Sequence, residues 1–349
     1  MSRVQTITVG PADNDQRLDR WLKRLFPHVP QGRIEKMCRK GEIRVDGGRV
    51  KASTRINTGQ SVRIPPLPEP GSAPRTAEPS KVSQADAKLM RSLVIYQDDH
   101  IIALNKPPGL PTQGGSKQTR HIDGLSEALQ GDYEDKPRLV HRLDKDTSGV
   151  LLLARTREAA QGLTAAMRHK ETRKIYWALV AGVPKPYLGE IRFGLVKAPG
   201  HGAKGEGEKM QAIHPAEVSR TPGAKRAHTL YATLYRVASR AAWVALEPIT
   251  GRTHQLRAHM AEIGHPIIGD GKYGGSGQEN MGDGWGAQIG GEISRKLHLH
   301  ARSMTFMHPV TGHVLTVTAS LPEHMARSWE TLGWTEDLAA DDPFEDLHR

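Results

Sequence analysis

A carboxylate surrounded by cations is the first feature of this sequence that could do chemistry. The stretch "LVHRLDKDTSGVLLLAR" spans residues 139–155 and sets a polar segment between two apolar runs. Within it, Asp144 lies between Arg142 and Lys145. Because nearby cations stabilise the charged form of a carboxylate, we expect Asp144 to be ionised. An ionised carboxylate is a poor general acid, but it is a good nucleophile or base toward a ribose carbon.

The second aspartate of this stretch, Asp146, suits a structural role better. It precedes Thr-Ser-Gly, small residues typical of turns, so its carboxylate is expected to cap the turn. The segment also resembles the start of a calcium loop, but Arg155 occupies the twelfth position, where such a loop needs a bidentate glutamate. The apolar run that begins at Val150 predicts a buried strand that keeps the loop rigid.

A second motif, "ITGRTHQLRAHMAEIGHPIIGDGKYG", covers residues 249–274. It places Arg252, Thr253 and His254 where a predicted strand gives way to a predicted helix over 254–263, with Thr253 as its N-cap. Free backbone N–H groups and cationic side chains at a helix start favour an anion. Arg257 follows one helical turn later, near the same end.

Two shorter segments share this character. "KIYWALV" predicts a strand that carries Tyr176, and "NKPPGLPTQGGSK" (105–117) predicts a stiff loop compatible with phosphate. "GHGAKG" at 200–205 matches a dinucleotide-binding pattern, but Pro199 precedes it and no apolar helical pattern follows. The histidines show neither HExxH nor Cys/His spacing. We therefore expect no metal and no cofactor.

The composition indicates a polyanionic partner. The chain has 349 residues, a net charge of +11 and a pI of about 9.7. No apolar run approaches the length of a membrane span, and the N-terminus has the pattern of neither a secretory signal nor a transit peptide. Cys38 is the single cysteine and falls at an apolar helical position, so we expect it in a core. These features favour a cytoplasmic protein with no membrane contact.

The N-terminal residues 1–64 predict a small basic domain. A helical stripe covers 16–26, a second helix ends before Gly41, "EIRVDGGRV" predicts a hairpin, and "SVRI" predicts a last strand. Residues 17–63 contain 13 Lys/Arg against four Asp/Glu. This order of elements resembles the alpha-L RNA-binding domain of ribosomal proteins. The cations expected to contact RNA are Arg17, Arg20, Lys23, Arg24, Arg33, Lys36, Arg39 and Lys40.

The rest of the chain predicts a linker, a large domain and a tail. Residues 65–90 are proline-rich and read as an extended linker, and the acidic tail 335–349 is expected to be disordered. Between them, 91–334 contains many short strands and few helices, the latter over 157–169, 254–263 and 321–333. For the last helix, Ser320 and Glu323 suggest a capping box. The fold class is therefore α+β, with a mixed, largely antiparallel sheet.

The long motifs together resemble the RluA family of RNA pseudouridine synthases. "HRLDKDTSGVLLLA" is similar to the central motif of that family, "GRTHQLRAHMAEIGHPIIGDGKYG" to its second long motif, and "LHLHARSMTFMHPVTG" to its C-terminal one. The leading alpha-L domain, "NKPPGLPT" and "KIYWALV" occur in the family's order. The linker, the 198–222 loop, the 275–291 insert and the tail lie outside the resemblance. "QGGS" resembles the branch that modifies several uridines of bacterial large-subunit ribosomal RNA.

The resemblance implies roles for individual residues. Asp144 corresponds to the catalytic aspartate, Tyr176 to the tyrosine that packs on the target uracil, and Arg257 to the basic residue paired with the aspartate. Arg142 corresponds to the arginine that supports base flipping. Leu256 is expected to form an apolar wall for the base, and Arg252 and His254 to contact substrate.

The expected function is the isomerisation of specific uridines in large-subunit ribosomal RNA, free or in a ribosome assembly intermediate, by a monomer. The carboxylate either attacks the sugar carbon or removes the neighbouring 2′ proton. Two alternatives remain at this stage: a synthase that acts on transfer RNA, and a ribosome-associated RNA-binding factor without catalysis. The set of Asp144, Tyr176 and Arg257 argues against the second alternative.

Overall fold

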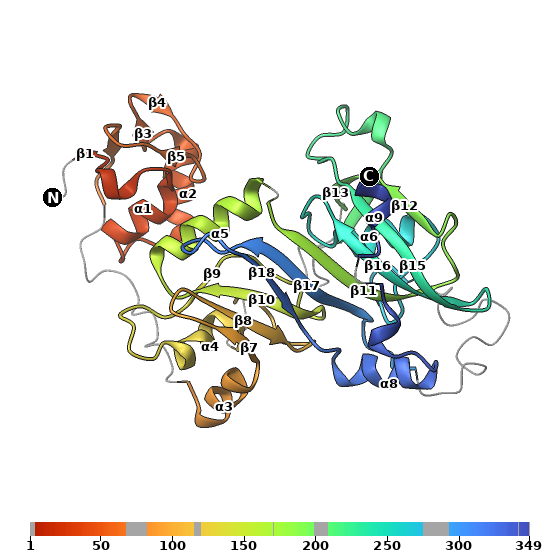
Figure 1. The fold of residues 1–349 in the computed structure, drawn as a ribbon. Helices are drawn as coiled ribbons and strands as arrows, with labels where there is room; N and C mark the ends of the chain where they lie inside the picture. Colours follow the sequence, from red (N-terminus) through yellow and green to blue (C-terminus); the bar gives the residue numbers. More distant parts are fainter. Residues whose placement is uncertain are drawn as a thin grey trace. The chain divides into compact units, whose positions relative to one another are not determined.

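The structure, a computed structural model, describes residues 4–67, 82–114, 120–169, 171–198, 209–274, 293–340 and 342–348. The chain divides into two compact units, residues 1–81 and residues 82–349 (Figure 1). The Gly-rich stretch at 200–205 and the 275–291 insert lie outside the described residues. No helix of the described residues is long and apolar enough to cross a membrane.

The first unit contains two helices and six short strands. Their bounds are β1 Gln5–Thr8, β2 Gln16–Arg17, α1 Leu18–Leu25, α2 Gln31–Lys40, β3 Arg44–Val45, β4 Gly48–Arg49, β5 Arg55–Ile56 and β6 Ser61–Ile64, with a 3-10 turn at Pro11–Asp13. Four strands form an antiparallel sheet in the order β1-β6-β3-β4, and β2 pairs with β5. Helix α1 begins two residues later than predicted because Gln16 and Arg17 form β2.

Local sequence signals explain the ends of these elements. Gly41 ends α2 in the left-handed conformation, as predicted (φ 71°). Asp46 and Gly47 both have positive φ at the tip of the β3–β4 hairpin, which fits the Asp-Gly turn predicted there.

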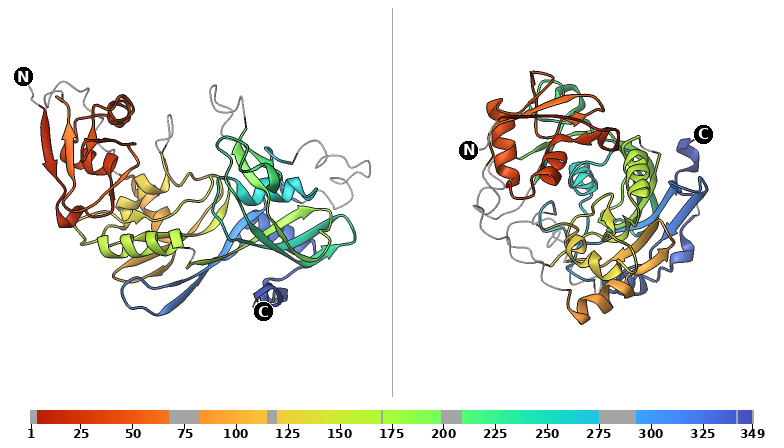
Figure 2. Two further views of the ribbon diagram at one scale, coloured as in Figure 1. Left: turned by 90° about the horizontal axis from the view of Figure 1, so that it is seen from above. Right: turned by 90° about the vertical axis from the view of Figure 1, so that its left-hand side faces the viewer.

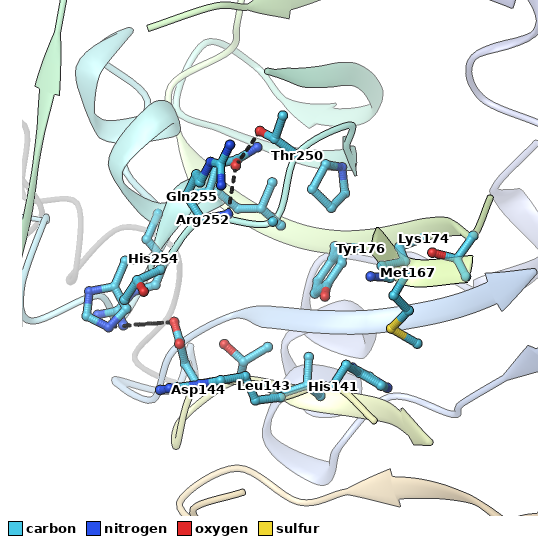
Figure 3. Close-up of a pocket in the computed structure, with 18 of the residues that line it drawn as sticks. His141, Leu143, Asp144, Met167, Lys174, Tyr176, Thr250, Arg252, His254 and Gln255 are labelled. Carbon is cyan, nitrogen blue, oxygen red and sulfur yellow. Dashed lines mark hydrogen bonds and ion pairs between the residues drawn. The ribbon is translucent and has the colours of Figure 1, made fainter. Parts of the chain in front are cut away.

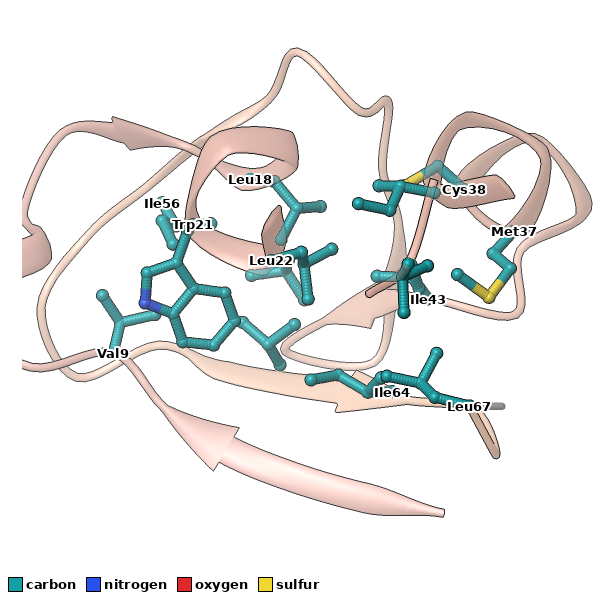
Figure 4. Close-up of a cluster of buried hydrophobic side chains, with 14 residues drawn as sticks. Val9, Leu18, Trp21, Leu22, Met37, Cys38, Ile43, Ile56, Ile64 and Leu67 are labelled. Atoms are coloured by element: carbon teal, nitrogen blue, oxygen red, sulfur yellow. The ribbon is translucent and has the colours of Figure 1, made fainter. Parts of the chain in front are cut away.

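The core of the first unit is built from one face of each helix. Leu18, Trp21 and Leu22 of α1 pack with Cys38 of α2 and with strand residues (Figure 4). Burial raises the pKa of the Cys38 thiol to about 11, so the thiol is not a nucleophile at neutral pH. The expectation of a core cysteine is confirmed.

The second unit is built on a ten-stranded sheet. Its strands are β7 Val94–Gln97, β8 Ile101–Lys106, β9 Arg138–Leu139, β10 Ser148–Ala154, β11 Arg173–Ala181, β12 Leu188–Ile191, β15 Thr229–Val237, β16 Ala241–Pro248, β17 Leu299–Met307 and β18 Val314–Thr318. The main order is β12-β15-β16-β11-β17-β10-β8-β7, with β18 beside β17 and β9 beside β10. β10 and β17 run parallel, and the other described pairs of this sheet are antiparallel. The predicted mixed, largely antiparallel α+β fold is confirmed.

Helices and a separate two-stranded hairpin flank this sheet. The helices are α3 Gln84–Ser92, α4 Ile122–Leu125, α5 Arg157–His169, α6 Gln255–Glu262, α8 Glu323–Thr331 and α9 Glu345–His348, with 3-10 turns at Ser126–Leu129, Pro215–Glu217 and Glu336–Leu338. The hairpin consists of β13 Gly194–Lys197 and β14 Met210–Ile213. Within this unit, α3 and α4 lie beside β7 and β8, whereas α6 lies at the other end, near β15 and β16 (Figures 1 and 2).

The parallel pair β10–β17 requires a glycine. Gly149 is paired with Ala301 and has φ 108°, and a Cβ at this position would lie 2.2 Å from the carbonyl oxygen of Ala301. No side chain fits there, so the Thr-Ser-Gly sequence allows β10 to approach β17 closely. As predicted, β10 is fully buried.

Three expectations about the chain's less regular parts were wrong. The last residues of the supposed linker form α3, whose N-cap Ser83 accepts a hydrogen bond from Asp86 N. Helix α8 follows Pro322, with no side-chain cap, so the capping box is absent. The tail is folded in its described residues, because Phe344 is buried in the core and Asp342 forms a two-pronged ion pair with Arg173.

Candidate functional site

One cavity of about 540 Å³ lies between the loop before β10, strand β11 and the start of α6 (Figure 3). All seven residues predicted to act in catalysis or substrate binding in this unit line it: Arg142, Asp144, Tyr176, Arg252, His254, Leu256 and Arg257. Segments more than a hundred residues apart in sequence therefore meet at one site.

The Asp144 loop is braced by the proline-rich loop after β8. The hydroxyl of Thr112 accepts from Leu143 N and donates to Leu143 O, on the residue before Asp144. The carbonyl of Lys145 accepts from Gly109 N and from the Lys106 ammonium, both at 2.9 Å. The described part of "NKPPGLPTQGGSK" thus braces the Asp144 loop, a structural role that the sequence did not predict.

Lys106 is fully buried below this loop. Its Nζ also donates to the carbonyls of Pro107 and Leu110. Burial lowers the pKa of Lys106 to about 7, and the charges of Asp146 and Asp144 oppose that shift. The turn itself is closed by a backbone hydrogen bond from Thr147 N to Asp144 O. Among the described hydrogen bonds Asp146 caps nothing, and it is exposed, so its expected capping role is not seen.

Tyr176 forms part of the cavity wall opposite Asp144 (Figure 3). The register of β11 against β17 shifts between Ile175 and Tyr176, a bulge that alters where the following side chains point. Burial, and secondly the charge of Asp144, raise the pKa of Tyr176. The phenol is therefore neutral at physiological pH, and its ring can receive a planar base.

A buried carboxylate holds the guanidinium of Arg257 in place beside Asp144. Its Nε and Nη2 donate to the two oxygens of Asp270, each at 2.7 Å, and the Asp270 side chain is fully buried. Its Nη1 lies 3.6 Å from Asp144 Oδ2. Burial alone would lower the pKa of Arg257, but the bonds to Asp270 and the charge of Asp144 raise it. A permanent cation is thus held beside Asp144 without a close hydrogen bond to it.

His254 approaches Asp144 from the start of α6. Its Nε2 lies 3.7 Å from Asp144 Oδ2, and its Nδ1 lies 3.0 Å from the hydroxyl of Tyr273. His254 itself is the N-cap of α6, in the left-handed conformation, so the predicted Thr253 cap was wrong. Burial lowers the pKa of His254, the charge of Asp144 opposes the shift, and Arg257 and Lys272 reinforce it.

Some of the donors expected to bind an anion at the start of α6 already donate to other groups of the protein. The side-chain oxygen of Gln255 accepts from Arg252 N at 3.0 Å and from the Thr250 hydroxyl at 2.7 Å. The guanidinium of Arg252 donates to Arg226 O. Arg142 is exposed, whereas Leu256 is nearly buried and presents an apolar surface to the cavity.

The sequence analysis missed three residues of this site. Lys174 and His141 line the cavity beyond Tyr176 (Figure 3), and Asp270 fixes Arg257. Lys174 could have been found, because it lies two residues before Tyr176 on a predicted strand, where alternate residues share a face. Burial lowers the pKa of Lys174, and no described acidic residue pairs with it. His141 Nε2 accepts from Leu152 N, and burial lowers its pKa to about 3.

The eight cations predicted to bind RNA lie in the first unit. Seven of them are exposed: Arg20, Lys23, Arg24, Arg33, Lys36, Arg39 and Lys40. Arg17 is half-buried and bonds Asp19, and Arg24 pairs with Asp13. Among the described residues, no group of three His, Cys, Asp or Glu side chains is placed to hold a metal ion.

Comparison with known proteins agrees with this geometry. Residues 100–262 match the family described as RNA pseudouridylate synthase, and residues 16–62 match the S4 domain. The chain is 34% identical to a ribosomal large subunit pseudouridine synthase C of Vibrio vulnificus, over 95% of this chain and 97% of that protein. It is also 34% identical to the Escherichia coli K12 protein of the same name, over 94% and 97%. A solved structure, human RNA pseudouridylate synthase domain containing 4, is 29% identical with a TM-score of 0.56, covering 71% of this chain and 95% of that one.

Proposed function

Because the chain belongs to the RNA pseudouridylate synthase family and is an RNA pseudouridine synthase, we propose that it converts uridines of large-subunit ribosomal RNA into pseudouridine, with Asp144 as the catalytic carboxylate. One observation carries the assignment of Asp144. It is the carboxylate that lines the cavity, and a neutral aromatic ring, a permanent cation and a histidine face it there. The names of the relatives support the choice of ribosomal RNA.

The reaction is an isomerisation and needs no net supply of atoms or electrons. The bond between uracil N1 and ribose C1′ breaks, the base turns, and a bond from C5 to C1′ forms while the proton on C5 is lost and N1 is protonated. Asp144 acts on the ribose, either as a nucleophile at C1′ or as a base at C2′. Its loop is braced on both sides, so the carboxylate is held in place before substrate arrives.

The other residues of the cavity bind the flipped nucleotide. Extrusion of a base costs a few kcal/mol, and stacking on an aromatic ring such as Tyr176 returns about 1–3 kcal/mol. Leu256 bounds the base on an apolar side. Lys174, which lacks a described acidic partner, binds a backbone phosphate at the far end of the cavity. Arg142, exposed at the cavity, contacts the RNA that surrounds the flipped nucleotide.

The first unit increases affinity for the RNA. Arg20, Arg33, Lys36 and Arg39 are exposed and have no described acidic partner, so they are available to phosphates. Such a unit suits a large structured RNA, and we propose that the enzyme acts on it as a cytoplasmic monomer. The same chemistry on transfer RNA is the competing substrate assignment.

The decisive test is tritium release from RNA labelled at C5 of uridine. Wild type is expected to release tritium from large-subunit ribosomal RNA, and Asp144→Asn is expected to release none while it still binds RNA. Asp146→Asn is the matched control, because it changes a carboxylate two residues away that is exposed, and it should retain activity.

Equal release by Asp144→Asn and wild type would remove Asp144 from the mechanism. Release from transfer RNA but not from ribosomal RNA would overturn the substrate assignment while the chemistry stands. Loss of activity in Asp146→Asn to the same extent as in Asp144→Asn would show that the effect comes from a disturbed loop and not from the loss of the Asp144 carboxylate.

A further inference from the structure

The backbone of His254 adopts a conformation that is uncommon for residues other than glycine. It has φ 51° and ψ 22°, in the left-handed region, and its side chain makes no capping hydrogen bond to α6. Glycine or asparagine occupies this region more readily. Residues held in such conformations occur at functional sites more often than elsewhere, so the imidazole itself calls for an explanation.

The His254 side chain bridges Asp144 and Tyr273. Nδ1 lies 3.0 Å from the Tyr273 hydroxyl. Nε2 lies 3.7 Å from Asp144 Oδ2, and Figure 3 shows this ion pair. Only about 10% of the imidazole is exposed, so little water competes for either nitrogen. The 3.7 Å separation is longer than a hydrogen bond, and catalytic contacts often shorten when substrate binds.

The hydrogen bonds of Tyr273 favour one tautomer of the His254 imidazole. Its oxygen already accepts from Met210 N at 2.8 Å. Burial raises the pKa of Tyr273 to about 12, so the phenol keeps its proton and can donate it to His254 Nδ1. Burial lowers the pKa of His254 and so favours the neutral ring, and a neutral ring that accepts from Tyr273 at Nδ1 carries its one proton on Nε2, toward Asp144.

The charged groups around the imidazole fit a neutral ring. Asp144 and Asp270 favour its protonation, whereas Arg257 and Lys272 oppose it, and burial adds to their effect. Arg257 already supplies the positive charge beside Asp144. His254 therefore adds a directed N–H donor without adding a second cation that would neutralise the carboxylate.

We propose that His254 is a positioning residue that donates from Nε2 to Asp144, with its tautomer set by the chain Met210 N–H, Tyr273 O–H and His254 Nδ1. This inference rests on the proposed role of Asp144. A donor on Oδ2 orients the carboxylate and leaves Oδ1 for the ribose. The first donor of this hydrogen-bond chain lies outside the main sheet, because Met210 belongs to hairpin β13–β14.

Packing fixes this hairpin against the site. Met210 and Ala212 of β14 pack with Tyr273 and with the buried Ala258 of α6. The hairpin therefore packs against α6, which carries both His254 and Arg257 near its start. Part of the 198–222 segment, which lacks a counterpart in the sequence resemblance, thus acquires a role in holding the catalytic carboxylate.

Two amide substitutions at position 254 separate this role from a structural one. In His254→Gln the side-chain nitrogen reaches about as far as imidazole Nε2, so a donor to Asp144 is kept and the bond to Tyr273 is lost. In His254→Asn the amide reaches only about as far as Nδ1, so the donor to Asp144 is lost. Asparagine nevertheless suits the left-handed backbone better than glutamine.

We expect kcat for tritium release to fall by about 10- to 100-fold in His254→Asn, from the loss of a hydrogen bond to a charged group. His254→Gln should retain several-fold more activity than His254→Asn, with KM for RNA similar in both. Tyr273→Phe should lower kcat in the wild-type background but cause no further loss in His254→Gln, which no longer needs the tautomer. Thermal unfolding checks that each variant is folded.

If the role were only to fit the backbone, Asn would match or exceed Gln, and that order would overturn the proposal. Additive losses for Tyr273→Phe in both backgrounds would overturn the tautomer chain. A wild type that releases no tritium from any RNA would instead refute the proposed function, so the two failures are distinguishable.

Discussion

Loss of the Asp270 charge should damage stability and catalysis together. Asp270 is fully buried and receives two 2.7 Å hydrogen bonds from Arg257. It also accepts from Lys272 N and Tyr273 N. In Asp270→Asn the side-chain oxygen can keep the backbone bonds, but an amide NH₂ now faces the guanidinium. The change therefore isolates the charge from the shape of the loop.

The expected cost follows from the burial of both partners. Breaking a buried, hydrogen-bonded ion pair by removing one charge destabilises a protein by about 3–5 kcal/mol, against a total of about 5–15 kcal/mol. The freed Arg257 is also expected to turn toward Asp144, whose Oδ2 lies 3.6 Å from Nη1. A closer ion pair at Oδ2 would displace the His254 donor from that oxygen and turn the carboxylate away from its position toward the ribose, so kcat should fall by at least about tenfold.

A double-mutant cycle gives the assay its control. Arg257→Met leaves a buried unpaired carboxylate and should also cost about 3–5 kcal/mol, but the double variant should be less destabilised than the sum of the singles. Tryptophan fluorescence during unfolding reports mainly on the second unit, whose core contains Trp177, Trp243, Trp329 and Trp334, with a contribution from Trp21 in the core of the first unit. The double variant should remain inactive in tritium release even where its stability recovers.

Two results would refute this reasoning. Asp270→Asn within about 1 kcal/mol of wild type would mean that the pair contributes little to stability. A double variant whose loss equals the sum would mean that Arg257 and Asp270 do not act on one another.

Three further outcomes are expected. Lys174→Met should raise KM for RNA several-fold and reduce the slope of log K against log salt by about one. The control Lys88→Met on α3 should change neither. An unchanged slope in Lys174→Met would refute the proposed contact between Lys174 and a phosphate. A variant of the full chain with Arg33→Gln, Lys36→Gln and Arg39→Gln should weaken RNA affinity more than kcat, whereas unchanged affinity would sink the binding role of the first unit. Because burial lowers the pKa of His298 to about 3 and of His300 to about 4, below the usual 6.5, the unfolded chain binds more protons between about pH 4 and 6.5. Unfolding free energy should therefore fall by about 2 kcal/mol per histidine from pH 7 to 5, and His300→Gln should show a shallower fall in urea titrations at the two pH values.

Periodicity and turn chemistry predicted much of the regular structure. The hairpin in "EIRVDGGRV", the buried run after Gly149 and the helix over 157–169 appear with nearly the predicted bounds, because each element is specified by its own local pattern. The helix starts were less predictable. Thr253 and Ser320 are good N-caps by type, yet His254 and Pro322 precede the helices, and neither makes a side-chain capping hydrogen bond.

The composition of the C-terminal segment gave a wrong prediction, because its acidic residues pair with cations far away in the sequence. The segment 335–349 looked disordered because it is acidic and has few large apolar residues. In the structure Asp342 pairs with Arg173 at the start of β11, Glu336 pairs with Arg302 of β17, and Phe344 is buried. A single sequence contains no sign of such pairs, so only the fold could reveal them. Asp270 was missed for the same reason, whereas the strand spacing could have identified Lys174.

The arrangement around Asp144 resolves a conflict in the chemistry that the sequence could only pose. Nearby positive charge favours the ionised form of a carboxylate, but a cation bonded directly to it would hinder the action on the ribose proposed for Asp144. In the structure Asp270 takes two of the donors of Arg257, so the guanidinium supplies charge to Asp144 from 3.6 Å without a short bond. The direction of the carboxylate must then be set by a neutral donor, and the imidazole of His254 is the described group placed to supply it. Charge and orientation are thus provided by different residues, and this is why substitutions at Asp270 and at His254 should impair the same reaction in distinguishable ways.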